Sequence, residues 1–155
     1  GPRRLGDITE REQAYRASLQ RHGLEVRDAC CQDSANDFAG GVAALDRLME
    51  LEDPPSAIVA PTDVIAIGML HAAQRRGLDV PRDISVTGFD DIPVATVSVP
   101  ALTTVRMPTE ARITAAVVLA IGAADPERDQ HPDLKPELVV RASTGPVPAP
   151  VTEGV

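Results

Sequence analysis

The chain has 155 residues, of which 43% are hydrophobic and 2% aromatic, and it contains no tryptophan. This length suits one globular unit with a core of Val, Ile, Leu and Ala, and it is too short for two independent domains. The formal net charge of -8 repels phosphate backbones, and the shortage of aromatic rings removes the stacking surface that single-stranded nucleic acid needs. We therefore expect that the chain as given binds neither DNA nor RNA by itself.

The sequence carries no motif of a catalytic, metal, cofactor or membrane site. Cys30 and Cys31 are neighbours and give no disulfide framework of the secreted kind, which favours a reducing, cytoplasmic location. No apolar run approaches the roughly 18 residues that a membrane span needs, and no leader marks export. A nucleophile elbow, a phosphate-binding glycine loop and a dinucleotide fingerprint are all missing, so we expect no enzyme activity and no cofactor. The histidines show no ligand spacing, and we expect no metal site at His22, His71 or His131.

The first predicted elements are a helix, a strand and a second helix. Residues 7–23 open with Thr9 and Glu12 spaced as a capping box and close at Gly23, which suits a left-handed cap, so they predict a helix. The short, mixed segment 24–31 predicts a strand. A further helix is predicted over 37–51, ahead of the prolines at 54 and 55, with one apolar face formed by Phe38, Val42, Leu45 and Leu48.

Two apolar strands flank the third predicted helix. The continuous apolar run 56–60 is typical of a central parallel strand. It leads into a helix that begins at Thr62 or Asp63 and ends at Gly77. Residues 84–89 form the next predicted strand. Strands that alternate with helices of this length form βαβ units, so the sequence predicts an α/β fold with a doubly wound parallel sheet.

Several polar residues fall at the predicted carboxyl edge of this sheet, where ligands bind in such folds. Asp90 and Asp91 follow one strand directly, Thr62 and Asp63 follow another, and Arg11 faces the same rim if its helix follows a strand. Carboxylates accept hydrogen bonds from adjacent hydroxyls, and arginine donates to ring and hydroxyl oxygens. This set of side chains is suited to a small polyhydroxylated ligand.

Each of these residues also has an ordinary structural explanation. The Asp90-Asp91 pair suits an Asx turn that leads into Ile92. Asp63 suits a helix N-cap, because aspartate is among the preferred capping residues. Arg11 suits a solvated position on a highly charged helix. The sequence alone leaves both sets of explanations open.

Four motifs together resemble one known family. They are AIVAPTDVIAIGMLHAAQRRG, VPRDISVTGFDD, PALTTVR and ELVVRAST, in this order, and the similarity extends from Gly1 to about Pro146. The chain resembles the carboxy-terminal lobe of the effector-binding core of the lac-repressor-like (LacI/GalR-type) bacterial transcription regulators. The resemblance implies a periplasmic-binding-protein-like (type I) lobe, a small effector such as a sugar, polyol or nucleobase-like metabolite, and a homodimer. It also implies that operator DNA is bound only through an amino-terminal domain missing from this chain.

The resemblance assigns roles to individual residues. Arg11 occupies the position of the family's effector-binding arginine and Asp90 that of its ligand-binding carboxylate, while Asp91 is expected to support the turn. Three further ligand-site positions depart from the family pattern: Thr62-Asp63 stands where Asn-Asp is common, Asn36 where an aromatic stacking residue is common, and Met107 where glutamine is frequent.

The resemblance also divides the chain. Residues 1–106 are expected to form the effector-binding lobe, 107–122 a helix that crosses toward an absent amino-terminal lobe, 134–145 a returning strand, and 146–155 a disordered tail. Two other functions remain open, namely a sugar-binding protein of a transport system and an unrelated enzyme on the same sheet. The crossing helix has an apolar face formed by Ile113, Val117, Leu119 and Ile121.

Overall fold

A four-stranded mixed sheet forms the centre of the protein. The computed structural model describes residues 6–122 and 134–147. The strands are β1 (Ala57–Val59), β2 (Ser85–Asp90), β3 (Thr103–Arg106) and β4 (Glu137–Val139). They lie in the order β1-β2-β3-β4; the first three are parallel, and β4 is antiparallel to β3. The α/β prediction is confirmed, while the antiparallel edge strand, common on such sheets, corrects the purely parallel expectation.

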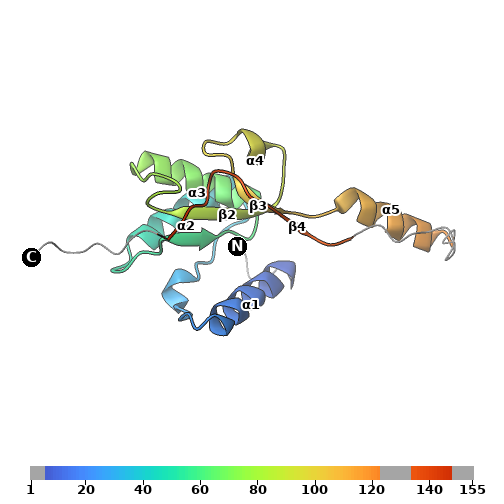
Figure 1. Cartoon of the computed structure of the whole chain (residues 1–155), viewed down its shortest axis with the longest axis horizontal. Helices are drawn as coiled ribbons and strands as arrows, with labels where there is room; N and C mark the ends of the chain where they lie inside the picture. Colours follow the sequence, from blue (N-terminus) through green and yellow to red (C-terminus); the bar gives the residue numbers. More distant parts are fainter. Residues whose placement is uncertain (1–5, 123–133, 148–155) are drawn as a thin grey trace, which may run out of the picture.

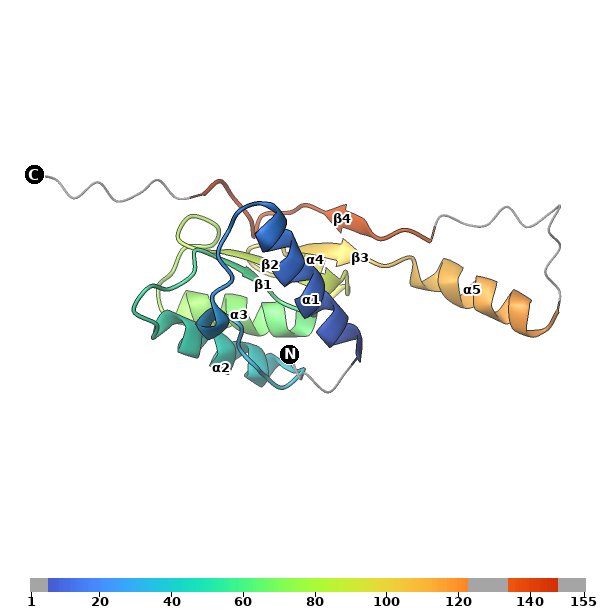
Figure 2. The ribbon, with the colours of Figure 1, turned by 90° about the horizontal axis from the view of Figure 1, so that it is seen from below.

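Helices cover both sides of this sheet. Figure 1 shows α3 and α4 on one side and α1 on the other, and α2 packs against α3. Figure 2, seen from the side of α1, shows this helix lying across the strands. The doubly wound arrangement is therefore confirmed. The bounds are α1 Gly6–Arg21, α2 Phe38–Met49, α3 Asp63–Arg75, α4 Val94–Val97 and α5 Thr109–Ala120.

Glycines follow α1 and α3 as the sequence predicts. Gly23 and Gly77 have φ angles of 69° and 74°, in the left-handed region that glycine enters without steric cost. The start of α3 is also confirmed, because Asp63 is its first residue and Thr62 is the N-cap residue. The capping box predicted at Thr9 and Glu12, at the start of α1, is wrong. The helix starts upstream of Thr9, so this threonine lies within the first turn and is not the N-cap.

The helix α2 begins and packs largely as predicted. Asp37 caps its first turn, where the carboxylate accepts a hydrogen bond from a backbone amide at 2.6 Å. Leu45 and Leu48 are buried as expected, but Phe38 is 42% exposed. The Phe38 ring instead contacts the imidazole of His71, with the ring centroids 5.3 Å apart. The largest fully buried apolar side chains of the core are Leu45, Ile65, Ile84, Leu102 and Val86.

The strand predicted over 24–31 is wrong. This segment is irregular and contains only a short 3-10 turn, Asp28–Cys30. A strand is stable only when a neighbouring strand accepts and donates its backbone hydrogen bonds. Cys30 and Cys31, at the end of this segment, line a cavity together with β1, and the segment does not pair with that strand. Among the described residues β1 is therefore an edge strand and not the predicted central one, and Val59 is left 61% exposed.

The helix α5 stands apart from the rest of the structure. Figures 1 and 2 both show it away from the sheet and the other helices, and none of its residues is buried. The apolar side chains of this region, Ile113, Val117, Leu119 and Ile121, are all more than half exposed.

The predicted division of the chain into 1–106, 107–122, 134–145 and 146–155 stays a prediction, and residues 148–155 of the tail lie outside the described residues. No described helix has both the length and the apolar composition that crossing a membrane requires.

Candidate functional site

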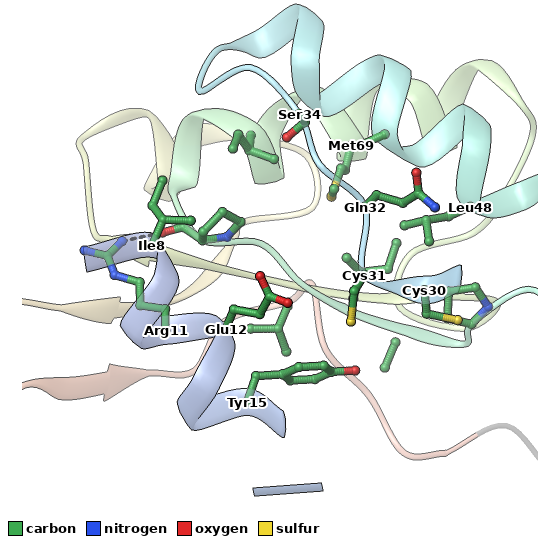
Figure 3. A pocket seen from close by; sticks show the side chains of 17 residues that line it. Ile8, Arg11, Glu12, Tyr15, Cys30, Cys31, Gln32, Ser34, Leu48 and Met69 are labelled. Carbon is green, nitrogen blue, oxygen red and sulfur yellow. Dashed lines mark hydrogen bonds between the residues drawn. The ribbon is translucent and has the colours of Figure 1, made fainter. Parts of the chain in front are cut away.

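Arg11 reaches the carboxyl edge of the sheet from α1. Its Nη1 donates a hydrogen bond to the carbonyl oxygen of Pro61, which lies just after β1. Its guanidinium lies over the ring of Phe89, near the end of β2, at 3.7 Å from the ring centroid. Figure 3 shows Arg11 extending from α1 toward this loop, close to Ile8. Arg11 therefore lies at the predicted rim and is half-buried, which argues against a simple solvated position.

Asn36 and Thr62 meet at this edge from two different loops. Asn36 precedes α2, and Thr62 precedes α3. The Oγ1 of Thr62 donates a hydrogen bond to the Oδ1 of Asn36 at 2.7 Å. Thr62 directly follows Pro61, whose carbonyl accepts from Arg11. The two polar side chains therefore continue the rim that begins at Arg11, with Asn36 exposed and Thr62 largely buried.

Asp63 lies beneath this rim and not on it. Its side chain is fully buried. One carboxylate oxygen, Oδ2, accepts a hydrogen bond from the backbone amide of Ile92 at 2.9 Å, and the other, Oδ1, accepts from the hydroxyl of Thr104 on β3. Both oxygens are thus used inside the protein, so Asp63 does not present a carboxylate to a ligand in this structure. The N-cap explanation does not hold either, because Thr62 occupies that position.

Asp90 and Asp91 differ sharply in their surroundings at the end of β2. Asp90 is exposed, whereas the side chain of Asp91 is only 7% exposed. Asp91 forms ion pairs with Arg106 at 2.7 Å and with Arg141 at 2.5 Å. Burial raises the pKa of Asp91, but the hydrogen bonds from Arg141 and Arg106 outweigh burial and hold this pKa below its usual value. These contacts agree with the expected role of Asp91 as a support of the turn.

Arg106 and Arg141 are structural partners of this turn that are absent from the predicted site. Each follows a run of residues that favour strands, TTV and LVV, and that pattern is the signal that places Arg106 at the end of β3 and Arg141 just after β4. Met107 comes directly after Arg106, which is the register partner of Asp90 in the sheet. Met107 is therefore near the same edge and half-buried. Of the six candidate residues, the structure brings five to this edge and places Asp63 beneath them.

A separate cavity of about 140 Å³ lies beside the free edge of β1. It is lined by side chains of α1, β1, α2 and α3 and of the loop that contains Cys30 and Cys31, and Figure 3 shows Tyr15, Cys30 and Cys31 around it. Burial raises the pKa of the Tyr15 hydroxyl and of the Cys31 thiol, so both stay protonated near neutral pH. Arg11 is the one candidate residue that lines this cavity. We therefore do not assign the candidate site to it.

Metal binding finds no support in the part of the chain that the structure describes. No group of three or more His, Cys, Asp or Glu side chains there is arranged to hold a metal ion. The polar side chains at the rim are instead one guanidinium, one exposed carboxylate, an amide and a hydroxyl, contributed by Arg11, Asp90, Asn36 and Thr62. Such a set offers both donors and acceptors to a neutral polar molecule.

The chain is similar to one family model and to several proteins named as transcription regulators. Residues 1–144 match the family model described as a periplasmic binding protein-like domain. The chain is 36% identical over 154 residues to the HTH-type transcriptional regulator MalR of Streptomyces coelicolor, which covers 96% of this chain and 44% of the relative. It is 33% identical over 153 residues to the HTH-type transcriptional repressor CytR of Escherichia coli, with the same two coverages. The chain thus spans about half the length of the curated relatives it matches.

Two solved structures of transcription regulators also superpose on this chain. A sugar-binding transcriptional regulator of the LacI family from Escherichia coli, complexed with phosphate, superposes with a TM-score of 0.78 at 30% identity, over 87% of this chain and 49% of that one. A LacI family transcriptional regulator from Lactobacillus casei, with bound sucrose, gives a TM-score of 0.76 at 29% identity, over 88% and 51%. The resemblance to the LacI-type effector-binding core is confirmed, and the chain belongs to the periplasmic binding protein-like domain family.

Proposed function

We propose that this chain is the effector-sensing lobe of a DNA-binding transcriptional regulator, and that the parent protein is a repressor. The observation that carries this proposal is that Arg11 reaches the edge of the sheet where β2 ends, with its guanidinium over the ring of Phe89, the residue before Asp90 in the chain. The relatives named as regulators support the proposal, and they argue against a transport protein.

We propose a small polyhydroxylated effector, a sugar or a related metabolite. Asp90 is exposed, and a carboxylate can accept hydrogen bonds from two adjacent hydroxyls of such an effector. Arg11 carries five N–H donors, so it can donate to a ligand oxygen while one donor stays on Pro61. Thr62 and Asn36 add a hydroxyl and an amide, and Met107 adds an apolar contact. Asp63 contributes indirectly, because its carboxylate fixes the backbone beneath the rim.

The proposal extends to DNA binding, cellular location and enzyme activity, and it rests on the charge of the chain and on its named relatives. Operator DNA is contacted through a part of the regulator other than this chain, whose net charge of -8 opposes phosphate binding. We propose a cytoplasmic location and no enzyme activity, in keeping with relatives that are named as transcription regulators.

We also infer that the regulator is a homodimer. Val97, the last residue of α4, and Val99, just after it, are 74% and 83% exposed, and the apolar side chains of α5 are exposed as well. Exposed apolar side chains of this kind commonly mark an interface. A second copy is the simplest occupant, because a two-fold axis lets one patch cover its own equivalent.

The proposal is tested by a ligand screen that reports position as well as binding. The chain is labelled with 15N, and sugars, polyols, nucleosides and nucleobases are added in turn while amide resonances are followed. A true effector shifts the amides of residues 88–91, and Asp90→Asn, which binds it more weakly, reduces these shifts at the same ligand concentration. Asp33→Asn, at another exposed aspartate in a loop, serves as the control. Ligands that shift only residues lining the cavity beside β1 would overturn the proposed site.

A further inference from the structure

The backbone at Asp90 and Asp91 has an unusual conformation. Their φ angles are 117° and 56°, and they are the only non-glycine residues with positive φ in the described part of the chain. An L-residue at φ near 117° brings its Cβ into conflict with the backbone, whereas glycine adopts this region freely. Asparagine and aspartate enter the left-handed region near 56° more readily than most residues do. The unfavourable conformation is therefore concentrated at Asp90.

One support for this conformation comes from Asp91. Its buried carboxylate is held by Arg106 from β3 and by Arg141 from the segment after β4. Arg141 is itself fixed, since its guanidinium donates to the carbonyl oxygen of Leu102 at 2.7 Å and its amide donates to the Thr103 hydroxyl at 2.9 Å. The side chain of Asp91 is thus turned inward across the end of the sheet.

A second support comes from Asp63, on the other side of the turn. Its carboxylate accepts from the amide of Ile92 and from the hydroxyl of Thr104, so it ties the residue after the aspartate pair to β3. Gly88 leaves room for this carboxylate, because a Cβ at that position would clash with the Oδ1 of Asp63. The chain is therefore held immediately after Asp90 by two buried carboxylates from different elements.

We propose that Asp63 and Asp91 are positioning residues, which hold Asp90 in a strained backbone conformation and so fix the direction of its carboxylate at the rim. This inference rests on the proposed function, in which Asp90 contacts the effector. Glycine at position 90 would adopt the same backbone without this strain, so the conformation has a local energetic cost that aspartate carries and glycine does not.

The first test measures strain in the absence of any ligand. Asp90→Gly and Asp90→Ala both remove the carboxylate, but only glycine relieves the backbone. We expect the thermal midpoint of Asp90→Gly to exceed that of Asp90→Ala by at least about 2 °C. Asp33→Gly is the matched control, because Asp33 has no positive φ and glycine there should lower the midpoint. A midpoint for Asp90→Gly at or below that of Asp90→Ala would show that the backbone is not strained.

The second test measures positioning. Arg106→Gln removes one partner of Asp91 at a half-exposed site, so this variant is expected to fold. Its control is Arg82→Gln, which removes ion pairs to Asp79 and Asp83 on the surface. In the free protein, Arg106→Gln should change the three-bond HN–Hα coupling of Asp90, which reports its φ angle, while Arg82→Gln should leave this coupling unchanged. An unchanged coupling in Arg106→Gln would refute the positioning role. Since no ligand is added, this outcome is independent of whether an effector binds at the rim.

Discussion

Asp91→Asn is predicted to destabilise the fold because it removes a buried charge from between two arginines. The Asp91 side chain is 7% exposed and Arg141 is 14% exposed, so their ion pair at 2.5 Å lies largely out of water. A hydrogen bond to a charged group contributes about 1.5–3 kcal/mol. Arg106 is 49% exposed, so its pair with Asp91 contributes less, about 0–1 kcal/mol. We therefore expect a loss of about 1.5–4 kcal/mol in the free energy of unfolding, a large part of the roughly 5–15 kcal/mol typical of a domain.

Urea unfolding followed by circular dichroism at neutral pH measures this loss. The midpoint should fall while the slope stays constant, because the variant exposes the same surface on unfolding. Asp46→Asn is the matched control, since it removes an ion pair with Arg76 in which both side chains are more than a third exposed. That variant should lose less than about 1 kcal/mol. Equal losses for Asp91→Asn and Asp46→Asn would refute the assignment of Asp91 as a buried structural charge.

Three further predictions concern pH, assembly and DNA. The pKa of Asp91 lies below its ordinary value of 3.8, so its ion pairs stabilise the fold fully above about pH 4, and this stabilisation is lost as pH falls through the lower folded-state pKa. Between pH 7 and pH 3 the wild type should therefore lose more unfolding free energy than Asp91→Asn, and equal losses would contradict the pKa direction. The exposed apolar face of α5 should make the chain self-associate, and Ile113→Glu together with Leu119→Glu should reduce this; sedimentation of the wild type as a monomer at high concentration, without binding of a hydrophobic dye, would argue against it. At moderate salt the chain should not retard operator-like DNA in a gel, because a net charge of -8 gives no counterion release, and specific retardation would disprove this.

Local sequence signals predict the local structure well. Gly23 and Gly77 mark the ends of α1 and α3 because the left-handed conformation after a helix strongly favours glycine. The segment 24–31 shows where such signals fail. Its composition is compatible with a strand, but a strand also requires a partner edge, and the local pattern contains no information on whether that edge is within reach.

The candidate site also combines features that the sequence predicts with features that depend on residues distant in the chain. Topology places Asp90 at the carboxyl edge, because parallel strands end together, but it places Arg11 there only if the first helix follows a strand. The sequence does not distinguish Asp63 from a rim carboxylate, since its burial depends on Thr104 and Ile92, which approach from β3 and from the turn after β2. Nor does it reveal the pairing of Asp91 with Arg141, which is 50 residues away along the chain. Long-range contacts of this kind separate the supporting carboxylates from the exposed one.

Calorimetric titration of the wild type and Asp90→Asn tests most directly whether Asp90 binds the effector. The ligand is the sugar, polyol or nucleobase that produces the largest thermal shift in the wild type, and both proteins are titrated at the same pH and salt concentration. Loss of a hydrogen bond to a charged group costs about 1.5–3 kcal/mol, so Asp90→Asn should bind roughly 10- to 100-fold more weakly while its unfolding free energy stays close to that of the wild type. Equal affinities for the two proteins would contradict the account and would leave the aspartate pair with a structural role alone.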